Sequence, residues 1–368
     1  MRLTDLVSST PSSAAPIQAR DPLIAGLTSD SRTVEPGWLF AALPGTKADG
    51  RAFVAEAVRR GAVAVLGPVG TTAPNGIAVI EDENPRLRLA QMAARFFGRQ
   101  PATVAAVTGT NGKTSTVQFA RQLWALLGRK AGSLGTLGIT APGMDRYGSL
   151  TTPDTVSLHR ALAELADAGI DHLAMEASSH GLDQFRLDGV KIAAAGFTNL
   201  SRDHLDYHGS MQAYLAAKAM LFDRVLPQGG AAVLNADTPE FTHLSELCAR
   251  RGHRLIGYGA QAKEIVLADL LPLPHGQRLK LEVFGRVHDI ALPLAGRFQC
   301  MNALCALGLV IGSGEDAGDA TAALEKLGGV HGRLELVANH PSGAPVYVDY
   351  AHTPDALETV LRALRPHA

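Results

Sequence analysis

The chain has 368 residues, 46% of them hydrophobic, and its net charge is −1. This length predicts two to three domains with sizeable cores, and the balanced charge argues against a nucleic-acid-binding or membrane-surface protein. Three cysteines without a CxxC pair exclude a disulfide framework or zinc site. With no bilayer-spanning apolar run and no apolar core in the first 22 residues, we expect a soluble cytoplasmic protein.

The first 99 residues predict a small α/β domain. Strands are expected at 38–43 and 62–66, and helices at 53–60 and 87–97. Two polar loops, 28–32 and 45–50, separate these apolar elements. They could bind a ligand, although their composition favours plain turns. The segment 98–101, Gly-Arg-Gln-Pro, ends the domain with a helix stop.

The central part of the chain, 100–333, opens with a phosphate-loop pattern. A β-branched apolar run at 103–108 leads into Gly109-Thr110-Asn111-Gly112, and a helical stripe of apolar residues follows. Glycines let backbone N–H groups approach a polyphosphate, and a helix N-terminus favours anions. Lys113 is then expected on the β- and γ-phosphates, and the Thr114 hydroxyl on Mg²⁺. Val107 replaces a glycine of the usual pattern, so an ordinary glycine-rich turn remains the alternative.

Beyond the loop, strands and helices alternate as in a mostly parallel sheet. The predicted strands 172–177 and 192–197 have polar residues at their C-terminal ends, where ligands of open α/β sheets bind. Alternating runs within 265–293 predict antiparallel hairpins at a sheet edge, and helices are expected at 298–311 and 317–327. After residue 333, one strand (346–349) and one helix (354–364) are too little for a core. This tail either docks on the central domain or begins a further, truncated domain, 334–368.

Several side chains after these strands could carry chemistry. Glu176 ends a strand and is placed to hold Mg²⁺, the alternative being a solvated loop carboxylate. His204 and His208 are four residues apart, so a helix would put both on one face. Zinc sites share this spacing, but no HExxH occurs. We expect at least His204 to face the site.

Lys218 lies on the apolar stripe of a helix that Ser210 should cap. Its stripe partners are Tyr214, Leu221, Phe222 and Val225. Such a lysine usually snorkels to the surface. If it is buried instead, its pKa falls, and a neutral amine can react with CO₂ to give a carbamate that suits Mg²⁺.

The motifs TGTNGKT, MEASSHGL and FTNLSRDHLDYHG occur in one order, together with SDSR, WLFAALPGTKADG, TTPD, HGRLE and VDYAHTPDAL. As a set they resemble the Mur ligase family over essentially the whole chain, and within it the branch that adds the third amino acid. Ser115, for the commoner Thr, and Ala177, for the commoner Val, are small departures. The resemblance implies an α/β fold with a small N-terminal domain, a P-loop domain whose mostly parallel sheet carries a small antiparallel part, and the start of a Rossmann-like C-terminal domain.

The resemblance also implies a role for each motif. ATP would contact Gly109, Thr110, Asn111, Gly112, Lys113, Thr114, Ser115, Asn302, Arg333, Asp349 and His352. The substrate UDP-MurNAc-L-Ala-D-Glu would contact Ser29, Ser31, Thr46, Lys47, Ala48, Thr151, Thr152, Ser178, Gln184 and Arg186. Two Mg²⁺ ions would use Thr114, Glu176, His204 and Lys218, the last as a carbamate; Lys113, Lys218 and His204 would be catalytic. We expect a monomer without nucleic-acid or membrane partners.

The family's reaction follows from these roles. The D-Glu carboxylate attacks the γ-phosphate of ATP, and an amino acid's amine then attacks the acyl phosphate. The family's DNPR-like motif for that amino acid does not occur here, so we expect the chain as given to be inactive. The Ala- and Arg-rich composition favours meso-diaminopimelate over L-lysine by association.

Three other readings compete. A folylpolyglutamate synthase would share the loop but should lack SDSR and TTPD. A phosphate-loop kinase or nucleotide switch would not need the first domain. A non-catalytic binding fragment is the third.

Overall fold

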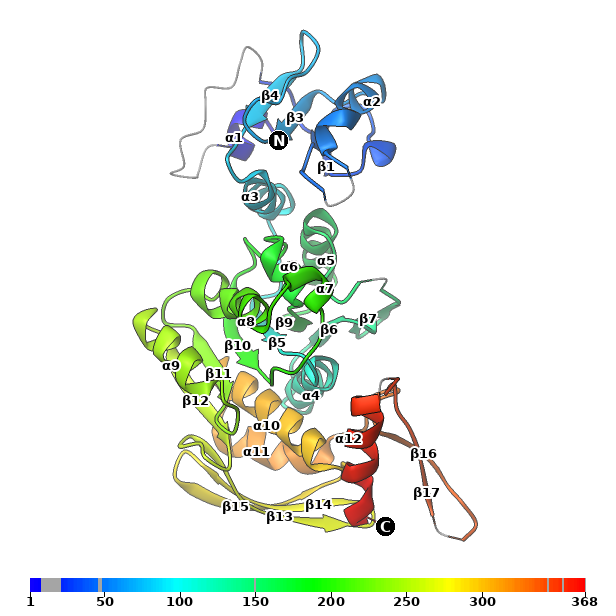
Figure 1. The fold of residues 1–368 in the computed structure, drawn as a ribbon, viewed down its shortest axis with the longest axis vertical. Coiled ribbons are helices and arrows are strands. Elements are labelled where there is room, and N and C mark those ends of the chain that lie inside the picture. Colours follow the sequence, from blue (N-terminus) through cyan, green and yellow to red (C-terminus); the bar gives the residue numbers. More distant parts are fainter. Residues whose placement is uncertain (8–20, 46–47, 149, 343, 353, 368) are drawn as a thin grey trace. The chain divides into compact units, whose positions relative to one another are not determined.

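The computed structural model describes residues 1–7, 21–45, 48–148, 150–342, 344–352 and 354–367 (Figure 1). The chain forms two compact units. The first comprises Met1–Gln100, Pro153–Asp167 and Asp183–Val190, and the second Pro101–Thr152, Ala168–Leu182 and Lys191–Ala368. The first unit thus contains the predicted domain 1–99 plus two later segments, and the predicted tail 334–368 lies within the second. The functional division into three domains stays a prediction.

The first unit contains a parallel four-stranded sheet in the order β1-β2-β3-β4. The predicted strands are β2 (Trp38–Ala41) and β3 (Ala64–Gly67), while β1 (Gly26–Thr28) and β4 (Ala78–Glu81) were not predicted. Helices α1 (Leu3–Val7), α2 (Val54–Arg59), α3 (Pro85–Phe97) and α5 (Thr155–Asp167) complete the unit, with short 3₁₀ turns at Ser31–Thr33 and Gly50–Phe53. Asn84 caps α3 through Leu87 N–H, and Gly98 ends it with a φ of 68°.

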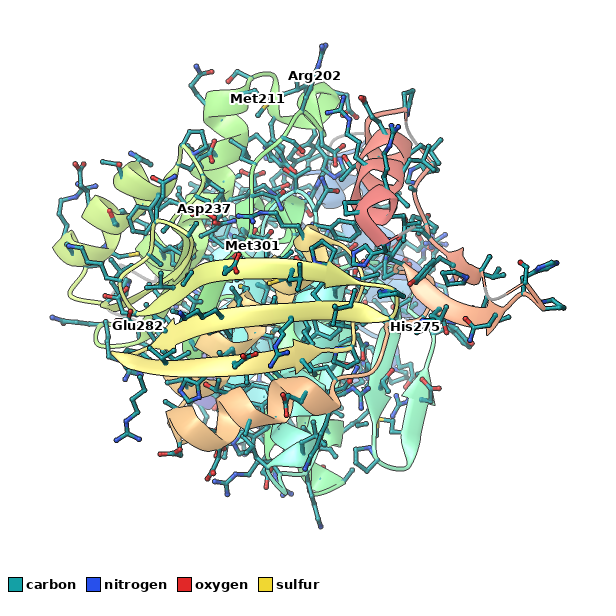
Figure 2. The ribbon with its side chains drawn as sticks, turned by 90° about the horizontal axis from the view of Figure 1, so that it is seen from below. Arg202, Met211, Asp237, His275, Glu282 and Met301 are labelled. Atoms are coloured by element: carbon teal, nitrogen blue, oxygen red, sulfur yellow. The ribbon has the colours of Figure 1, made fainter. Side chains whose placement is uncertain are left out.

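The second unit is built on an eleven-stranded sheet in the order β15-β14-β13-β12-β11-β10-β5-β9-β6-β7-β8. Its strands from β13 to β6 pair in parallel, and the outer pairs on both sides are antiparallel. The predicted edge hairpins are confirmed as β13 (Ile265–Leu273), β14 (Gly276–Val283) and β15 (Arg286–Leu292), the long strands at the front of Figure 2. The other strands are β5 (Thr103–Thr108), β6 (Ala131–Gly135), β7 (Gly138–Ala141), β8 (Met144–Arg146), β9 (His172–Glu176), β10 (Ile192–Phe197), β11 (Ala231–Asn235) and β12 (Arg254–Gly259).

Two helices, α4 (Lys113–Leu126) and α10 (Arg297–Gly312), pack on this sheet and on each other. The apolar stripe of α4 is confirmed, because Val117, Leu123 and Trp124 are at most 2% exposed. Helix α10 is buried almost all round, and a Cβ at Gly308 would overlap Val233 of β11. The glycine therefore lets the helix backbone approach the sheet closely.

The remaining helices are α6 (Ser179–Asp183), α7 (Leu205–His208), α8 (Met211–Met220), α9 (Phe241–Arg250) and α11 (Ala317–Ala323), with a π-helical turn at Leu221–Val225 and a 3₁₀ turn at Leu324–Lys326. Ser210 caps α8 by accepting from Ala213 N–H, as predicted. Among the described residues, no helix combines the length and apolarity needed to cross a membrane.

The tail forms a hairpin of β16 (Glu335–Asn339) and β17 (Pro345–Val348), followed by α12 (Pro354–Leu364) and a 3₁₀ turn at Arg365–His367. Strand β16 was not predicted. His367 fastens the tail to the second unit: its Nδ1 donates to Leu273 O (2.7 Å), and its Nε2 accepts from Gly296 N–H (2.9 Å). These bonds hold the tail against the rest of the second unit, and the prediction that 334–368 begins a further domain is kept.

Candidate active site

The loop between β5 and α4 requires its two glycines. Gly109 and Gly112 have φ values of 148° and 85°. A Cβ at Gly109 would overlap Thr198 Oγ1, and one at Gly112 would overlap Asn302 Oδ1. Helix α4 starts directly after this turn, so the backbone N–H groups of its first turn are open to an anion. This strand, turn and helix arrangement is the one that the sequence predicted.

The segment after β10 holds the loop in place. Thr110 N–H donates to Asn199 O (2.9 Å), and Asn111 N–H donates to Asn199 Oδ1 (3.0 Å). In return, Thr198 Oγ1 donates to Asn111 O (2.6 Å). Asn235 Nδ2, at the end of β11, donates to Thr198 O and so holds the segment that contacts the loop. Residues that follow strands β10 and β11 therefore fix the conformation of the loop.

Lys113 folds back on its own loop. Its Nζ donates to Gly109 O and to Thr110 O, both at 2.8 Å. Desolvation lowers the pKa of Lys113, while the charges of Glu176 and Asp203 oppose this shift. The Nζ of Lys113 thus lies against the loop, where a phosphate oxygen could replace these carbonyl acceptors. The predicted contact with β- and γ-phosphates stays a prediction.

Lys218 is fully buried, with 1% of its surface exposed, so the snorkelling alternative is wrong. Its Nζ donates to Gly109 O (2.8 Å) and lies 4.1 Å from the centre of the Tyr214 ring. Burial, and secondly the charge of Lys113, lower the pKa of Lys218 to about 6. The predicted apolar stripe around it is confirmed, since Tyr214, Leu221, Phe222 and Val225 are all buried. A largely neutral amine therefore lies beside the phosphate loop at neutral pH.

Glu176 is also buried, with 1% exposure, and the alternative of a solvated loop carboxylate is wrong. Its Oε1 accepts from Thr114 Oγ1 (3.0 Å) and from Thr136 N–H (2.8 Å), and its Oε2 accepts from Thr136 Oγ1 (3.2 Å). Gly135 makes room for the carboxylate, because a Cβ there would overlap Oε1. The structure thus joins two of the predicted metal ligands, Thr114 and Glu176.

The two predicted histidines face one cluster. His204 lies just before helix α7 and has a left-handed backbone (φ 50°). Its ring centre and that of His208 nevertheless lie 6.1 and 5.1 Å from the Tyr214 ring centre, and both rings contact His180. His204 is half-exposed beside Asp203 (Nε2 to Oδ2, 3.4 Å), and its ring centre lies 5.0 Å from that of His180. The ranges described hold no group of three or more His, Cys, Asp or Glu placed to bind one metal ion.

The side chains predicted near adenine and ribose connect only in part. Asn302 faces Gly112 and donates to Gln299 Oε1 (3.0 Å), and Gln299 donates to Arg333 O (2.7 Å). Gln299 was not predicted; its place one turn before Asn302 on α10 is the only signal in the sequence. Asp349 and His352 bond instead to their own tail, at Leu334 N–H, Ala351 N–H and Tyr350 O.

The predicted substrate residues fall into both units. In the second, Thr152 Oγ1 donates to Glu176 O (2.8 Å) and accepts from Ser178 N–H (3.0 Å), and Thr151 bonds to Thr136. In the first, Ser31 donates to Glu56, and Arg186 donates to Gln184. Ser29 and Ala48 are exposed, while Thr46 and Lys47 lie outside the described residues.

Family models match two stretches of the chain. Residues 107–310 match the Mur ligase middle domain, and residues 23–97 match the catalytic domain of the Mur ligase family. The first match contains the phosphate loop, Glu176 and Lys218.

Curated relatives match at about half identity. The chain is 52% identical over 355 residues to the UDP-N-acetylmuramoyl-L-alanyl-D-glutamate–2,6-diaminopimelate ligase of Caulobacter vibrioides, covering 95% of this chain and 73% of that protein. It is 51% identical over 367 residues to the ligase of the same name from Mesorhizobium japonicum, and the match covers 100% of this chain and 75% of that protein.

Solved structures of similar fold include a ligase with the same name as these relatives. A structure of a ligase of that name superposes with a TM-score of 0.87 and 30% identity, covering 100% of this chain and 74% of the other. The Mycobacterium tuberculosis folylpolyglutamate synthase complexed with ADP has a TM-score of 0.61 at 23% identity, and the match covers 76% of this chain and 68% of the other. This similarity shows a shared fold. The chain belongs to the Mur ligase family.

Proposed function

We propose that the protein is an ATP-dependent ligase that adds the third amino acid, meso-diaminopimelate, to UDP-MurNAc-L-Ala-D-Glu in peptidoglycan precursor synthesis. The relatives that are about half identical over 73–75% of their length carry this activity in their names. The observation that carries the proposal is the site itself: a phosphate loop with Lys113, Lys218 and Glu176 gathered around it. Because ATP and UDP-linked precursors are cytoplasmic metabolites, we place the reaction in the cytoplasm.

The ATP side of the site is the loop from Gly109 to Ser115, with Asn302 against Gly112. Backbone N–H groups and Lys113 bind the phosphates. Arg333, Asp349 and His352 complete the nucleotide site in this proposal. The peptide side consists of Thr151, Thr152 and Ser178 in the second unit. The UDP part is assigned to Ser29, Ser31, Thr46, Lys47 and Ala48, with Gln184 and Arg186 on the sugar and peptide.

Mg²⁺ fits the pair Thr114 and Glu176. Mg²⁺ takes hard oxygen ligands at 2.0–2.1 Å in an octahedron, so neighbouring ligand oxygens lie about 3 Å apart. Thr114 Oγ1 and Glu176 Oε1 are 3.0 Å apart. The ion would neutralise charge on the phosphates during transfer. His204 and a carbamate on Lys218 are proposed ligands of a second ion.

The carbamate follows from the state of Lys218. With its pKa lowered to about 6, the amine is mostly neutral at pH 7 and retains a free electron pair. Its nitrogen can attack the carbon of CO₂ and lose one proton to solvent, which leaves an anionic carboxylate. That group would also offset the positive charge of the neighbouring Lys113. Tyr214 and the apolar stripe exclude water and thereby keep the amine neutral.

In the proposed reaction, the terminal D-Glu carboxylate attacks the γ-phosphate of ATP, and ADP leaves. The amine of diaminopimelate attacks the resulting acyl phosphate, and phosphate leaves from the tetrahedral intermediate. Lys113 and the N–H groups of the loop stabilise the transferring phosphate, so the chain contributes mainly position and charge.

The test measures product with the complete protein encoded by the gene. It receives UDP-MurNAc-L-Ala-D-Glu, ATP and Mg²⁺ with either meso-diaminopimelate or L-lysine, and mass spectrometry detects the tripeptide. We expect ATP-dependent tripeptide with diaminopimelate and far less with lysine. Lysine as the preferred substrate would refute the specificity, and turnover with a folate substrate in place of the UDP-peptide would refute the proposed function.

A further inference from the structure

Thr136 donates two hydrogen bonds to the Glu176 carboxylate, whereas Thr114 donates one. Thr136 lies in the two-residue turn between β6 and β7, and its side chain is exposed. Its N–H donates to Glu176 Oε1 (2.8 Å) and its Oγ1 donates to Oε2 (3.2 Å), so one residue holds both carboxylate oxygens. Two bonds to two oxygens fix the rotation of the carboxylate plane, which a single bond would leave free.

The hydroxyl network has a definite direction. A carboxylate only accepts hydrogen bonds, and a threonine hydroxyl has one proton to give. Because Thr136 donates that proton to Glu176, its 3.1 Å contact with Thr151 Oγ1 must be donated by Thr151. A chain of hydrogen bonds thus runs from Thr151 through Thr136 to Glu176.

Glu176 has a third partner, Thr114 Oγ1, at 3.0 Å. If Thr114 and Glu176 bind one ion, the Thr114 oxygen turns a lone pair to the metal, and this hydrogen bond is lost. Thr136 then supplies both remaining hydrogen bonds to the carboxylate. Outer partners of this kind orient metal ligands, and their loss typically lowers metal affinity about 10–100-fold.

We propose that Thr136 is a positioning residue that orients Glu176 for a divalent cation and connects it to Thr151. The proposal rests on the metal role assigned to Glu176 above. It predicts that removing the Thr136 hydroxyl lowers cation affinity although the residue binds neither the ion nor ATP. Since Thr136 is exposed in a turn, its replacement should not disturb the core.

The experiment measures the Kd of Mn²⁺ for the protein–ADP complex from the electron paramagnetic resonance signal of free Mn²⁺. The variants are Thr136→Val, Thr136→Ser and Glu176→Gln. Thr140→Val is the matched control, because Thr140 lies in the same hairpin on β7 and its hydroxyl pairs with Asp145 instead (3.5 Å). Circular dichroism verifies folding of each variant.

We expect Thr136→Val to raise the Mn²⁺ Kd about 10-fold, Thr136→Ser to restore it, and Thr140→Val to match the wild type. A wild-type Kd in Thr136→Val, or an equal loss in Thr140→Val, would overturn the positioning role while a weakened Glu176→Gln variant still supports the metal site. If Glu176→Gln binds Mn²⁺ like the wild type, the metal role in the proposed function fails, and the role of Thr136 fails with it.

Discussion

Replacing Lys218 with methionine should stabilise the second unit at neutral pH. The lysine is 1% exposed, and burial lowers its pKa from 10.5 to about 6. Folding at pH 7 therefore removes a proton that the unfolded chain holds. Because pH 7 lies 3.5 below the unfolded pKa, this costs about 5 kcal/mol. Methionine has no such cost and fits an apolar surrounding.

The loss of one hydrogen bond offsets part of the gain. Gly109 O loses its bond from Lys218 but keeps the bond from Lys113, so the carbonyl stays satisfied and the loss is about 1 kcal/mol. The net gain is about 4 kcal/mol at pH 7. Between pH 6 and 10.5 the unfolded wild type binds one more proton than the folded state, so wild-type stability rises by about 1.4 kcal/mol per pH unit. The advantage of the variant shrinks accordingly as pH rises.

Urea unfolding from pH 6 to 9.5 measures this effect in CO₂-free buffer. Trp124 is buried in the second unit, and a Trp38→Phe background leaves it as the only tryptophan. Lys263→Met, at an exposed position, is the control and should keep the wild-type pH slope. A destabilised Lys218→Met protein at pH 7, or an unchanged pH slope, would refute the neutral buried lysine.

Three further predictions concern the loop and the first unit. Gly112→Ala should weaken ATP binding more than 10-fold in calorimetry, because its Cβ would overlap Asn302 Oδ1; Gly128→Ala, with a similar φ of 81° and open space, should bind ATP normally. Lys113→Ala should abolish ATP-dependent turnover and retain binding of the UDP-peptide, and joint loss of both ligands in a folded variant would contradict this. Burial lowers the pKa of His159 from 6.5 to about 4, so the first unit should lose about 3 kcal/mol of stability as pH falls through this range; His159→Gln should flatten the acid limb in urea titrations, and an unchanged limb would contradict the prediction.

Local patterns predicted the elements that depend on nearest neighbours along the chain. The strand 103–108, the strand 192–197 and the helix 354–364 agree with the structure at both ends, because alternation, glycine turns and proline starts mark them. Strands β1, β4 and β16 were among those not predicted. Strands β1 and β4 have only three and four residues, and the residues of β16 are mostly exposed, so none of them leaves a strong periodic signal.

One part of the site could be predicted from the sequence and another part could not. The loop, with Lys113 and Thr114, could be predicted because its functional residues are consecutive in the chain. The burial of Glu176 could not be predicted, because it depends on Gly135 and Thr136, which lie at the end of the neighbouring strand β6 and in the turn after it. The spacing of His204 and His208 predicted that both would lie on one side. Both rings do contact His180 and Tyr214, but His204 does so from a left-handed backbone before the helix begins.

By itself the sequence determined the α/β class, the phosphate loop and the family, since these rest on short motifs and on the period of apolar residues. Only the tertiary structure decided which polar groups share a low-dielectric site. The hydrogen bonds from Lys218 to Gly109, and from Thr114 and Thr136 to Glu176, join residues that are 40 to 109 positions apart in the chain. Their protonation and orientation are set by desolvation and hydrogen bonds from distant segments, and no local pattern encodes these.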